Sequence, residues 1–449
     1  MRILAIDPGL QWIEGKQVPR VYPRIGFAYI ATVLSKHHSV TVVDISAARM
    51  ISPNLAEIVD RVNPELICIT SVAFHHSEAC ATGHLAQKMC PGVPVVYGGA
   101  HCTALYEEFA RIGDCVVLGE GESTILEIAD NLEQGLTAWD DIRGIAYTNE
   151  SECVVTRTRE QISDLDTLPF PDWSLYDYSQ YLSIPSESND PISFYSINSM
   201  RGCPYVCSFC SDLHGTQVRY RSSASVVDEM ERNRNMFGAR HFDFADSNMT
   251  VNKEHFIDFC EDLRERELDV LWNMETRVDL VDEEIVQAAK QAGCQVICFG
   301  IESGDEYMLK KMGKSFTTDE IEAAVCMATD AGLLVKSSFM LGHPYETEDS
   351  VEKTCALAKH LRMEYGMDLY CGLLDVYPTT QVHHMAEEKE GCRWVEGMRE
   401  NWDAIQRTTA TVETDELSAA TLESLLHTFT TDIEKIPAPD YYRGKTKGK

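Results

Sequence analysis

Three cysteines stand close together near the middle of the 449-residue chain. Cys203, Cys207 and Cys210 belong to the segment MRGCPYVCSFC, residues 200–210, which follows the strand expected at 194–198. Thiolates are soft ligands that favour iron–sulfur clusters or zinc. A closed zinc site needs four ligands and a closed cluster needs four cysteines. Three cysteines in a tight loop therefore predict a [4Fe–4S] cluster that leaves one iron open.

Two alternatives remain for these cysteines at this point. A distant residue such as His214 could complete a zinc site, or the three thiols could be uncoordinated. Cys294 and Cys298 are also four residues apart. We expect the former in a helix-to-strand turn and the latter inside a buried strand, so we interpret both as core thiols.

The elements that must position the cysteine loop alternate between strands and helices from residue 193 to about 376. Six strand–helix units predict a partial (β/α)6 barrel, in which the active site lies at the carboxyl ends of the strands. The expected strands are 194–198, 241–245, 270–273, 296–300, 335–341 and 369–373.

A second α/β region precedes the barrel. Strand–helix alternation over residues 1–140 predicts a doubly wound, Rossmann-like sheet that binds ligands at the carboxyl ends of its strands. Its expected strands are 2–6, 40–44, 66–70, 94–97 and 115–118. We predict a hairpin and linker at 141–190, the barrel at 191–380, and a small, mainly helical region with a basic tail at 381–449.

The cysteine motif, with an aromatic residue before its last cysteine, resembles that of the radical S-adenosylmethionine (SAM) superfamily. Segments 242–250, 272–279, 299–304 and 339–347 resemble the superfamily's later strand ends. This resemblance implies SAM contacts from Phe209, Asp246, Arg277, Glu302, Ser303, Leu341 and Gly342. Tyr345 stands where we expect glycine, and it joins Glu275 as a candidate substrate contact. We assign no catalytic residue.

The chemistry of these side chains agrees with that assignment. A carboxylate such as Asp246 or Glu302 suits an ammonium group and ribose hydroxyls, and Arg277 suits the methionine carboxylate. The Phe209 ring offers a face for adenine.

The amino-terminal region carries half of a second motif. Ser71-Val72-Ala73, followed after 24 residues by Gly98-Gly99, resembles the cobalamin-binding signature S-x-L…G-G. The other half, D-x-H-x-x-G, is missing, because the corresponding residues 7–11 read DPGLQ. We therefore assign no histidine ligand to cobalt. Further cobalamin contacts are expected from His101, Gly119, Glu120 and Gly121.

The combined resemblance is to cobalamin-dependent (class B) radical SAM enzymes. It implies a C-methyltransferase that uses a [4Fe–4S] cluster, SAM and cobalamin, and an electron donor such as ferredoxin or flavodoxin. There is a weaker resemblance to the methanogen enzyme that C-methylates a glutamine of methyl-coenzyme M reductase, which makes a protein or peptide a candidate substrate. The alternatives are a cobalamin-containing cyclase or rearrangement enzyme and a non-catalytic cobalamin or metal sensor.

Composition restricts the remaining function classes. The formal net charge is −32, and such an acidic surface disfavours a nucleic-acid substrate. No apolar run approaches the ~20 residues of a membrane span, and the first residues do not resemble a signal peptide. Sixteen scattered cysteines suit a reducing compartment. We expect a cytoplasmic protein with no membrane partner.

Overall fold

The computed structural model describes residues 1–9, 12–13, 16–17, 22–45, 55–136, 138–181, 193–211 and 213–437. The chain divides into two compact units, Met1–Leu182 and Ser183–Lys449. The predicted basic tail at 443–449 lies outside the described residues. None of the helices in the described part is long and apolar enough to cross a membrane.

The first unit is built on a seven-stranded sheet in the order β4-β1-β5-β6-β7-β8-β9. The first five strands of that order are parallel, and the last two form an antiparallel hairpin. The strands are β1 (Arg2–Asp7), β4 (Ser39–Asp44), β5 (Leu66–Thr70), β6 (Val95–Gly98), β7 (Cys115–Val117), β8 (Ile145–Asn149) and β9 (Glu152–Val155). Two further short strands, β2 (Trp12–Ile13) and β3 (Lys16–Gln17), pair separately.

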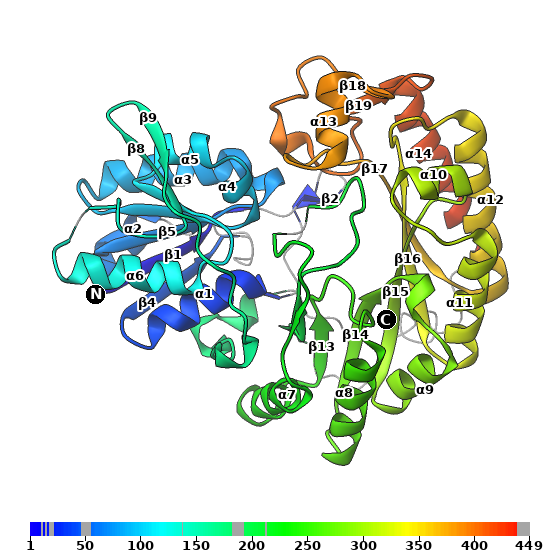
Figure 1. Cartoon of the computed structure of the whole chain (residues 1–449), viewed down its shortest axis with the longest axis horizontal. Coiled ribbons are helices and arrows are strands. Elements are labelled where there is room, and N and C mark those ends of the chain that lie inside the picture. The colour runs from blue at the N-terminus through cyan, green and yellow to red at the C-terminus, as the bar shows by residue number, and fades with distance from the viewer. Residues whose placement is uncertain are drawn as a thin grey trace. The chain divides into compact units, whose positions relative to one another are not determined.

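Helices cover both faces of this sheet (Figure 1). One buried cluster joins the sheet to α2, α3 and α5, and another joins it to α1 and α6. The helices are α1 (Ile25–Ser35), α2 (Leu55–Val62), α3 (His76–Met89), α4 (Ala100–Ala104), α5 (Tyr106–Ile112) and α6 (Glu122–Glu133). The predicted doubly wound arrangement is confirmed. The β8–β9 hairpin extends the sheet, so it belongs to this unit instead of standing between two domains.

The second unit contains a six-stranded parallel sheet in the order β10-β13-β14-β15-β16-β17. These strands are β10 (Phe194–Ile197), β13 (His241–Phe244), β14 (Leu271–Thr276), β15 (Cys294–Glu302), β16 (Leu334–Leu341) and β17 (Asp368–Leu373). Helices line the outside of the curved sheet (Figure 1). They are α7 (Ser223–Phe237), α8 (Lys253–Glu265), α9 (Glu283–Gln291), α10 (Glu306–Lys311), α11 (Thr318–Asp330) and α12 (Glu348–Tyr365). The predicted partial barrel is confirmed.

The region after β17 packs on the barrel. It contains helices α13 (Gln381–Glu388) and α14 (Ala419–Glu434) and an antiparallel pair, β18 (Cys392–Trp394) and β19 (Val412–Thr414). The expectation of a mainly helical region missed this pair. Leu422 and Leu426 of α14 lie in one buried cluster with Leu341 and Leu373 of the barrel.

Cys294 is a core thiol as we expected, although its place in the fold differs, whereas Cys298 is not fully buried. Cys294 is the first residue of β15 and is buried, instead of lying in a turn. Cys298 is only half-buried. Side chains alternate along a strand, and Ile297 and Phe299 are fully buried, so Cys298 lies on the opposite, interior face of the barrel.

Candidate functional site

The cysteine loop leaves the carboxyl end of β10, and a short antiparallel pair closes its base. Strands β11 (Met200–Arg201) and β12 (Arg219–Tyr220) form this pair. Within the loop, the amide of Cys203 donates to the Gly215 carbonyl at 3.0 Å and that of Cys210 to the Cys207 carbonyl at 3.0 Å. Cys203 and Cys207 are half-buried and Cys210 is exposed. The loop is therefore folded while its cysteines stay accessible.

The spacing of the three sulfur atoms bears on which metal group the loop could hold. Among the described residues, two groups of three or more candidate ligands have all ligand atoms within 4.8 Å, and neither includes these cysteines. Zn–S bonds of about 2.3 Å in a tetrahedral site would put the sulfurs about 3.8 Å apart. In a [4Fe–4S] cluster each cysteine binds a different iron, which suits a wider set. Three accessible thiols in one loop are a donor set that fits a [4Fe–4S] cluster with one open iron.

Ser208 fixes the middle of the cysteine loop, and it was not predicted. Its amide donates to the Met312 carbonyl at 3.1 Å, and its carbonyl accepts from the Val382 amide at 3.0 Å. Its hydroxyl lies 2.7 Å from Nε2 of His343. Burial lowers the pKa of His343 to about 4, so this ring is neutral near pH 7. Three separate elements thus hold the loop.

Asp246 follows β13 and is buried. Its carboxylate accepts hydrogen bonds from the amides of Ser199 at 2.8 Å and Met200 at 3.2 Å, and from the Ser199 hydroxyl. Burial raises the pKa of this carboxyl. The side chain predicted to contact an ammonium group therefore holds the backbone that enters the cysteine loop.

Arg277 follows β14 and is also buried. Its Nε and Nη2 donate to the two carboxylate oxygens of Asp279 at 2.8 and 2.9 Å. The guanidinium carbon lies 3.9 Å from the ring centroid of Tyr205, inside the cysteine loop. The buried Nη1 has no hydrogen-bond partner in the described part of the chain. This donor is placed beside the loop and available to an acceptor such as a carboxylate.

Glu302 ends β15 with a left-handed backbone, φ +70°. One carboxylate oxygen lies 3.3 Å from Nζ of Lys314, and the other accepts from the Ser338 hydroxyl at 3.2 Å. Glu302 and Phe209 line the same open cavity at the strand ends, of about 140 Å³. The structure thus brings these two predicted residues together.

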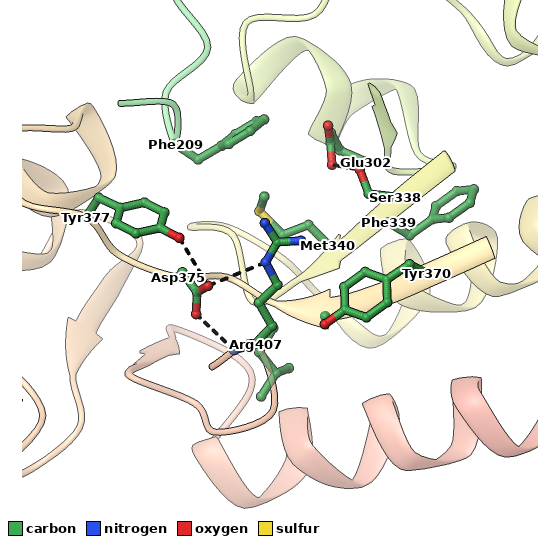
Figure 2. Close-up of a pocket in the computed structure, with 11 residues that line it drawn as sticks. Phe209, Glu302, Ser338, Phe339, Met340, Tyr370, Asp375, Tyr377 and Arg407 are labelled. Carbon is green, nitrogen blue, oxygen red and sulfur yellow. Dashed lines mark hydrogen bonds and ion pairs between the residues drawn. The ribbon is translucent and has the colours of Figure 1, made fainter. Parts of the chain in front are cut away.

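The other residues of this cavity come from the last two strands and the region after them (Figure 2). They are Ser338, Phe339, Met340, Tyr370, Gly372, Leu373, Asp375, Tyr377 and Arg407. Asp375 could have been found from the sequence, because it closely follows the strand predicted at 369–373. Arg407 carried no such signal, since it lies in an irregular segment well after the last strand predicted from the sequence.

Asp375 and Arg407 form an ion pair on one wall of the cavity. Oδ2 of Asp375 lies 3.6 Å from Nε of Arg407, and Oδ1 accepts from the Arg407 amide at 3.1 Å. Burial raises the pKa of the Asp375 carboxyl to about 6, and the neighbouring guanidinium opposes that rise.

Glu275, a predicted substrate contact, is on β14 between the outward-facing, buried Met274 and Thr276. By the alternation of a strand, it faces the barrel interior. Solvent still reaches its side chain, but the surrounding protein, together with the carboxylates of Asp243 and Glu302, raises its pKa to about 7. This carboxyl changes charge near neutral pH.

Three further residues that were predicted to contact SAM, Ser303, Leu341 and Gly342, are bonded to or buried by other parts of the protein. The Ser303 hydroxyl lies 3.2 Å from that of Thr354 on α12. Leu341 is fully buried, and the Gly342 amide donates to the buried carboxylate of Glu346. Burial raises the pKa of Glu346 to about 8. These residues shape the strand end, and none of them lines the described cavity.

Tyr345, the second candidate substrate contact, also lies apart from that cavity. Its hydroxyl donates to Glu390 at 2.6 Å, and Nζ of Lys311 lies 4.2 Å from its ring centroid. The ring also packs closely on Gly391. The tyrosine therefore joins α10 to the region after the barrel.

In the first unit, Ser71 and Gly98-Gly99 meet at the carboxyl ends of β5 and β6. The Ser71 amide donates to the Gly98 carbonyl at 3.3 Å. Gly99 has φ +98°, and a Cβ there would lie 2.8 Å from Oγ1 of Thr70. Val72 and the buried Ala73 continue from Ser71 into a short 3-10 turn. The backbone is therefore close-packed where the resemblance places the nucleotide tail of cobalamin.

The segment 119–121 lies at the end of the neighbouring strand β7. The Gly119 amide donates to the Thr103 hydroxyl at 3.1 Å. The Glu120 carboxylate accepts from the Ile162 amide at 2.8 Å, so it holds the segment after the hairpin. Gly121 precedes α6, and a Cβ there would lie 3.0 Å from the side chain of Ile30.

The end of β1, where a cobalt-binding histidine would follow, is filled by other side chains. The Asp7 carboxylate accepts from Nε of Arg24 at 2.9 Å, and Nη2 of Arg24 lies 3.2 Å from Nδ1 of His75. A Cβ on Gly9 would overlap the buried His75 ring.

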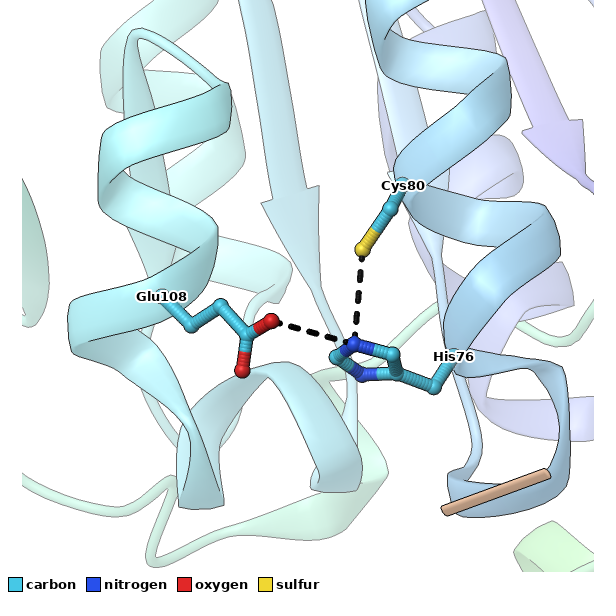
Figure 3. A group of neighbouring side chains, drawn as sticks. All are labelled: His76, Cys80 and Glu108. Carbon is cyan, nitrogen blue, oxygen red and sulfur yellow. Dashed lines mark hydrogen bonds and ion pairs between the residues drawn. The ribbon is translucent and has the colours of Figure 1, made fainter. Parts of the chain in front are cut away.

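His101 is buried, and its Nε2 lies 3.1 Å from Nδ1 of His76. Burial, followed by His76, lowers the pKa of His101 to about 3. Nε2 of His76 in turn lies 3.1 Å from Oε1 of Glu108 and 3.6 Å from Sγ of Cys80 (Figure 3). One ring nitrogen of His101 is thus directed at this group.

The sequence matches two family models in succession. Residues 15–129 match the B12 binding domain, and residues 197–358 match the Radical SAM superfamily. An uncharacterized methyltransferase of Pyrococcus horikoshii is 30% identical over 371 residues, which cover 82% of this chain and 79% of the relative. The anaerobic magnesium-protoporphyrin IX monomethyl ester cyclase of Rubrivivax gelatinosus is 30% identical over 370 residues, covering 80% of this chain and 66% of the relative.

The solved structures agree on the fold. The radical SAM methyltransferase TsrM from Kitasatospora setae, solved with cobalamin and a [4Fe–4S] cluster, has a TM-score of 0.71 at 19% identity, covering 98% of this chain and 89% of TsrM. The family resemblance of the motifs is therefore confirmed: the chain belongs to the radical SAM superfamily and carries a B12-binding domain ahead of its radical SAM domain.

Proposed function

We propose that the protein is a cobalamin-dependent radical SAM methyltransferase that methylates an unactivated carbon. The observation that carries this proposal is the succession of a B12-binding match and a radical SAM match in one chain. The 30% identity to a protein named a methyltransferase supports the methyl-transfer reaction.

In this proposal Cys203, Cys207 and Cys210 hold the cluster, and SAM binds at the strand ends of the barrel. Nη1 of Arg277 receives the methionine carboxylate, because it is a buried donor beside the cysteine loop. Glu302 binds ribose hydroxyls and Phe209 packs on the adenine, since both line the cavity. When bound, the cluster supplies the electron that cleaves SAM, and cobalamin carries the methyl group.

Cobalamin binds at the strand ends of the first unit in the same proposal. The close-packed backbone of Ser71, Val72, Ala73, Gly98 and Gly99 accepts the nucleotide tail, and Gly119 and Gly121 border it. We keep Glu120 and His101 as contacts through their backbones, because their side chains bind Ile162 and His76. No histidine is placed below cobalt.

The reaction also needs partners that bind from outside. A low-potential donor such as ferredoxin or flavodoxin would reduce the cluster. Within the protein class of substrates, we propose a glutamine of methyl-coenzyme M reductase as one candidate. Methylation would add about 14 Da to the tryptic peptide that contains that glutamine, which mass spectrometry detects.

The central test is anaerobic purification followed by iron, sulfide and cobalamin analysis and incubation with SAM labelled at the methyl carbon. A labelled product supports the proposal. Zinc bound in place of iron contradicts it. Cofactor binding with neither a labelled product nor 5′-deoxyadenosine would identify a sensor. Replacing the three cysteines by alanine should abolish the absorption of a thiolate-held cluster.

A second candidate function is a cyclase reaction without methyl transfer. The 30% identity to the Rubrivivax gelatinosus cyclase over 80% of this chain favours it specifically. The same incubation separates the two candidates, because 5′-deoxyadenosine formed without label transfer supports the cyclase reaction.

A further inference from the structure

One wall of the barrel cavity is built from residues that the superfamily match does not cover. The match ends at residue 358, whereas Asp375, Tyr377 and Arg407 all line the cavity. In the proposed function, the residues that bind SAM all lie within the match. Residues that line the cavity beyond the match are therefore candidates for recognition of the substrate.

The chain holds Arg407 at this wall by several independent contacts. Its amide donates to Oδ1 of Asp375 at 3.1 Å, and its carbonyl accepts from the Leu373 amide at 2.7 Å. Its backbone is left-handed, φ +60°. A Cβ on Gly372 would lie 2.8 Å from Cβ of Arg407, so the glycine allows this approach. A strained, non-glycine residue persists only where its surroundings fix it, and such residues cluster at functional sites.

The guanidinium extends into the cavity from this fixed backbone (Figure 2). Its Nε lies 3.6 Å from Oδ2 of Asp375, and its central carbon lies 5.6 Å from the ring centroid of Tyr370. A separation of 3.6 Å is too long for a hydrogen bond, so Asp375 orients the charge without a fork-to-fork contact. Glu302, across the cavity, already has Lys314 at 3.3 Å.

Resting on the proposed function, we infer that Arg407 recognises an anionic group of the substrate, a carboxylate or a phosphorus oxyanion. Arginine is suited to such groups because its planar fork binds two oxygens at once. The rings of Tyr370 and Tyr377, which also line the cavity, suit an apolar or aromatic body. An internal glutamine of a polypeptide has no such anion, so this inference favours a small acid or a chain terminus over that candidate.

The methionine carboxylate of SAM is also an anion that an arginine could bind. The experiment must therefore distinguish binding of SAM from binding of a substrate anion. Arg277 is the candidate for that carboxylate, because it lies within the superfamily match and presents its buried Nη1 beside the cysteine loop. If the two arginines serve different anions, replacing Arg407 should leave the affinity for SAM unchanged.

The experiment uses the full-length protein and a matched pair of probes, 3-phenylpropionate and 3-phenylpropionamide, titrated by ligand-observed NMR. The wild type should bind the acid about 10-fold more tightly than the amide, because a charged hydrogen bond is lost in the amide. Arg407→Gln should remove this preference and Arg407→Lys should keep part of it. Arg399→Gln, which removes an exposed arginine paired with Glu387, should keep all of it.

Equal binding of acid and amide by the wild type, or a preference that survives in Arg407→Gln, would overturn the inference. A 10-fold loss of SAM affinity in Arg407→Gln would also overturn it, because the guanidinium would then serve the cosubstrate. If the glutamine variant fails to fold, the lysine variant still tests the inference, because it should keep part of the preference for the acid. Binding of the probes requires neither the cluster nor cobalt. A failure of the proposed function would therefore be seen in other measurements, as missing cofactors or missing label transfer, and would not be confused with a failure of this inference.

Discussion

At the scale of the residue, Arg277 gives the sharpest test of the SAM site. In the wild type, Nε and Nη2 of Arg277 bind Asp279, and Nη1 has no hydrogen-bond partner among the described residues. Arg277→Lys keeps the positive charge but removes this planar fork. A lysine cannot serve both acceptors from one nitrogen in that geometry. We expect the dissociation constant for SAM to rise about 10-fold, the loss of one charged hydrogen bond. Equilibrium dialysis of the reconstituted protein measures it.

The matched control is Arg240→Lys, in an exposed pair with Asp269. It should leave SAM affinity unchanged, since exposed ion pairs contribute about 1 kcal/mol or less to stability. Iron content should be the same in both variants. Wild-type SAM affinity in Arg277→Lys would show that Nη1 does not bind the cosubstrate.

Single residues also show what the sequence could not predict. Residue type and position after a strand were enough to single out Asp246 and Glu302. They could not predict that the Asp246 carboxylate accepts hydrogen bonds from the amides of Ser199 and Met200. Which groups a carboxylate binds depends on how the neighbouring loop folds back. Arg407 could not be found at all, since it reaches the cavity from an irregular segment.

At the scale of the element, the cysteine loop depends on Gly202. This residue has φ +89°, and a Cβ there would lie 2.3 Å from the Gln217 carbonyl oxygen. Gly202→Ala should therefore displace the loop relative to β12 and lower the iron content per chain by more than half, while the far-ultraviolet circular dichroism spectrum stays unchanged. Iron analysis after anaerobic reconstitution measures it.

Gly238→Ala serves as the control for strain alone. Gly238 ends α7 with φ +69°, but a Cβ there would have no atom within 4 Å. The two variants share a left-handed backbone and differ in the clash. Equal iron content in both would show that the approach of Gly202 to Gln217 does not hold the cluster loop.

The loop between β16 and α12 predicts a specific pH dependence of stability. Burial raises the pKa of Glu346 from 4.5 to about 8. Between those values the folded state holds a proton that the unfolded state has lost, so this residue's contribution to stability falls as pH rises. Glu346→Gln is neutral at every pH and should gain stability relative to wild type from pH 5 to 8, by on the order of 3 kcal/mol.

Thermal unfolding of both proteins across that pH range tests this difference. Glu348→Gln, at an exposed position on α12, is the control and should follow the wild type. A constant difference between Glu346→Gln and wild type would show that Glu346 is ionised in the folded protein.

Elements were more predictable than contacts, for a physical reason. Apolar runs predicted the strands of both sheets, because parallel strands buried on both faces lose their polar alternation. The first and last residues of the strands were predicted less accurately. Strand β14 continues to Thr276 and β15 begins at Cys294, beyond the apolar runs, because interior-facing polar residues such as Glu275 continue the strand. The β18–β19 pair was missed because its strands are three residues long.

At the scale of the whole molecule, each unit has its own buried core. The first unit packs helices on both faces of its sheet, and the second joins α14 to the barrel strands. Alternation of strands and helices was enough to predict two α/β units. It could not show that the hairpin would extend the first sheet, because edge pairing depends on which strand is left open.

Two cores imply that the two cofactors can be removed independently. Gly99→Ala places a Cβ 2.8 Å from Thr70 and 3.2 Å from the Ser71 carbonyl, so it should lower cobalamin content several-fold and leave iron unchanged. Cys203→Ala should do the reverse. Either change should abolish transfer of labelled methyl from SAM, because the proposed reaction needs both cofactors. Cobalt and iron analysis of each variant, beside the label assay, measures all three quantities.

The control for Gly99 is Gly92→Ala, in the same unit. Gly92 has φ +82°, but a Cβ there would meet no atom within 4 Å, so cobalamin content should stay near the wild-type value. The cyclase alternative makes a different prediction for the pair of cofactor variants, since both would lose cyclised product while the wild type itself would transfer no label. Methyl transfer that persists in Gly99→Ala despite lost cobalamin would mean that the first unit does not carry the methyl group. The methyltransferase assignment would then have to rest on the barrel alone.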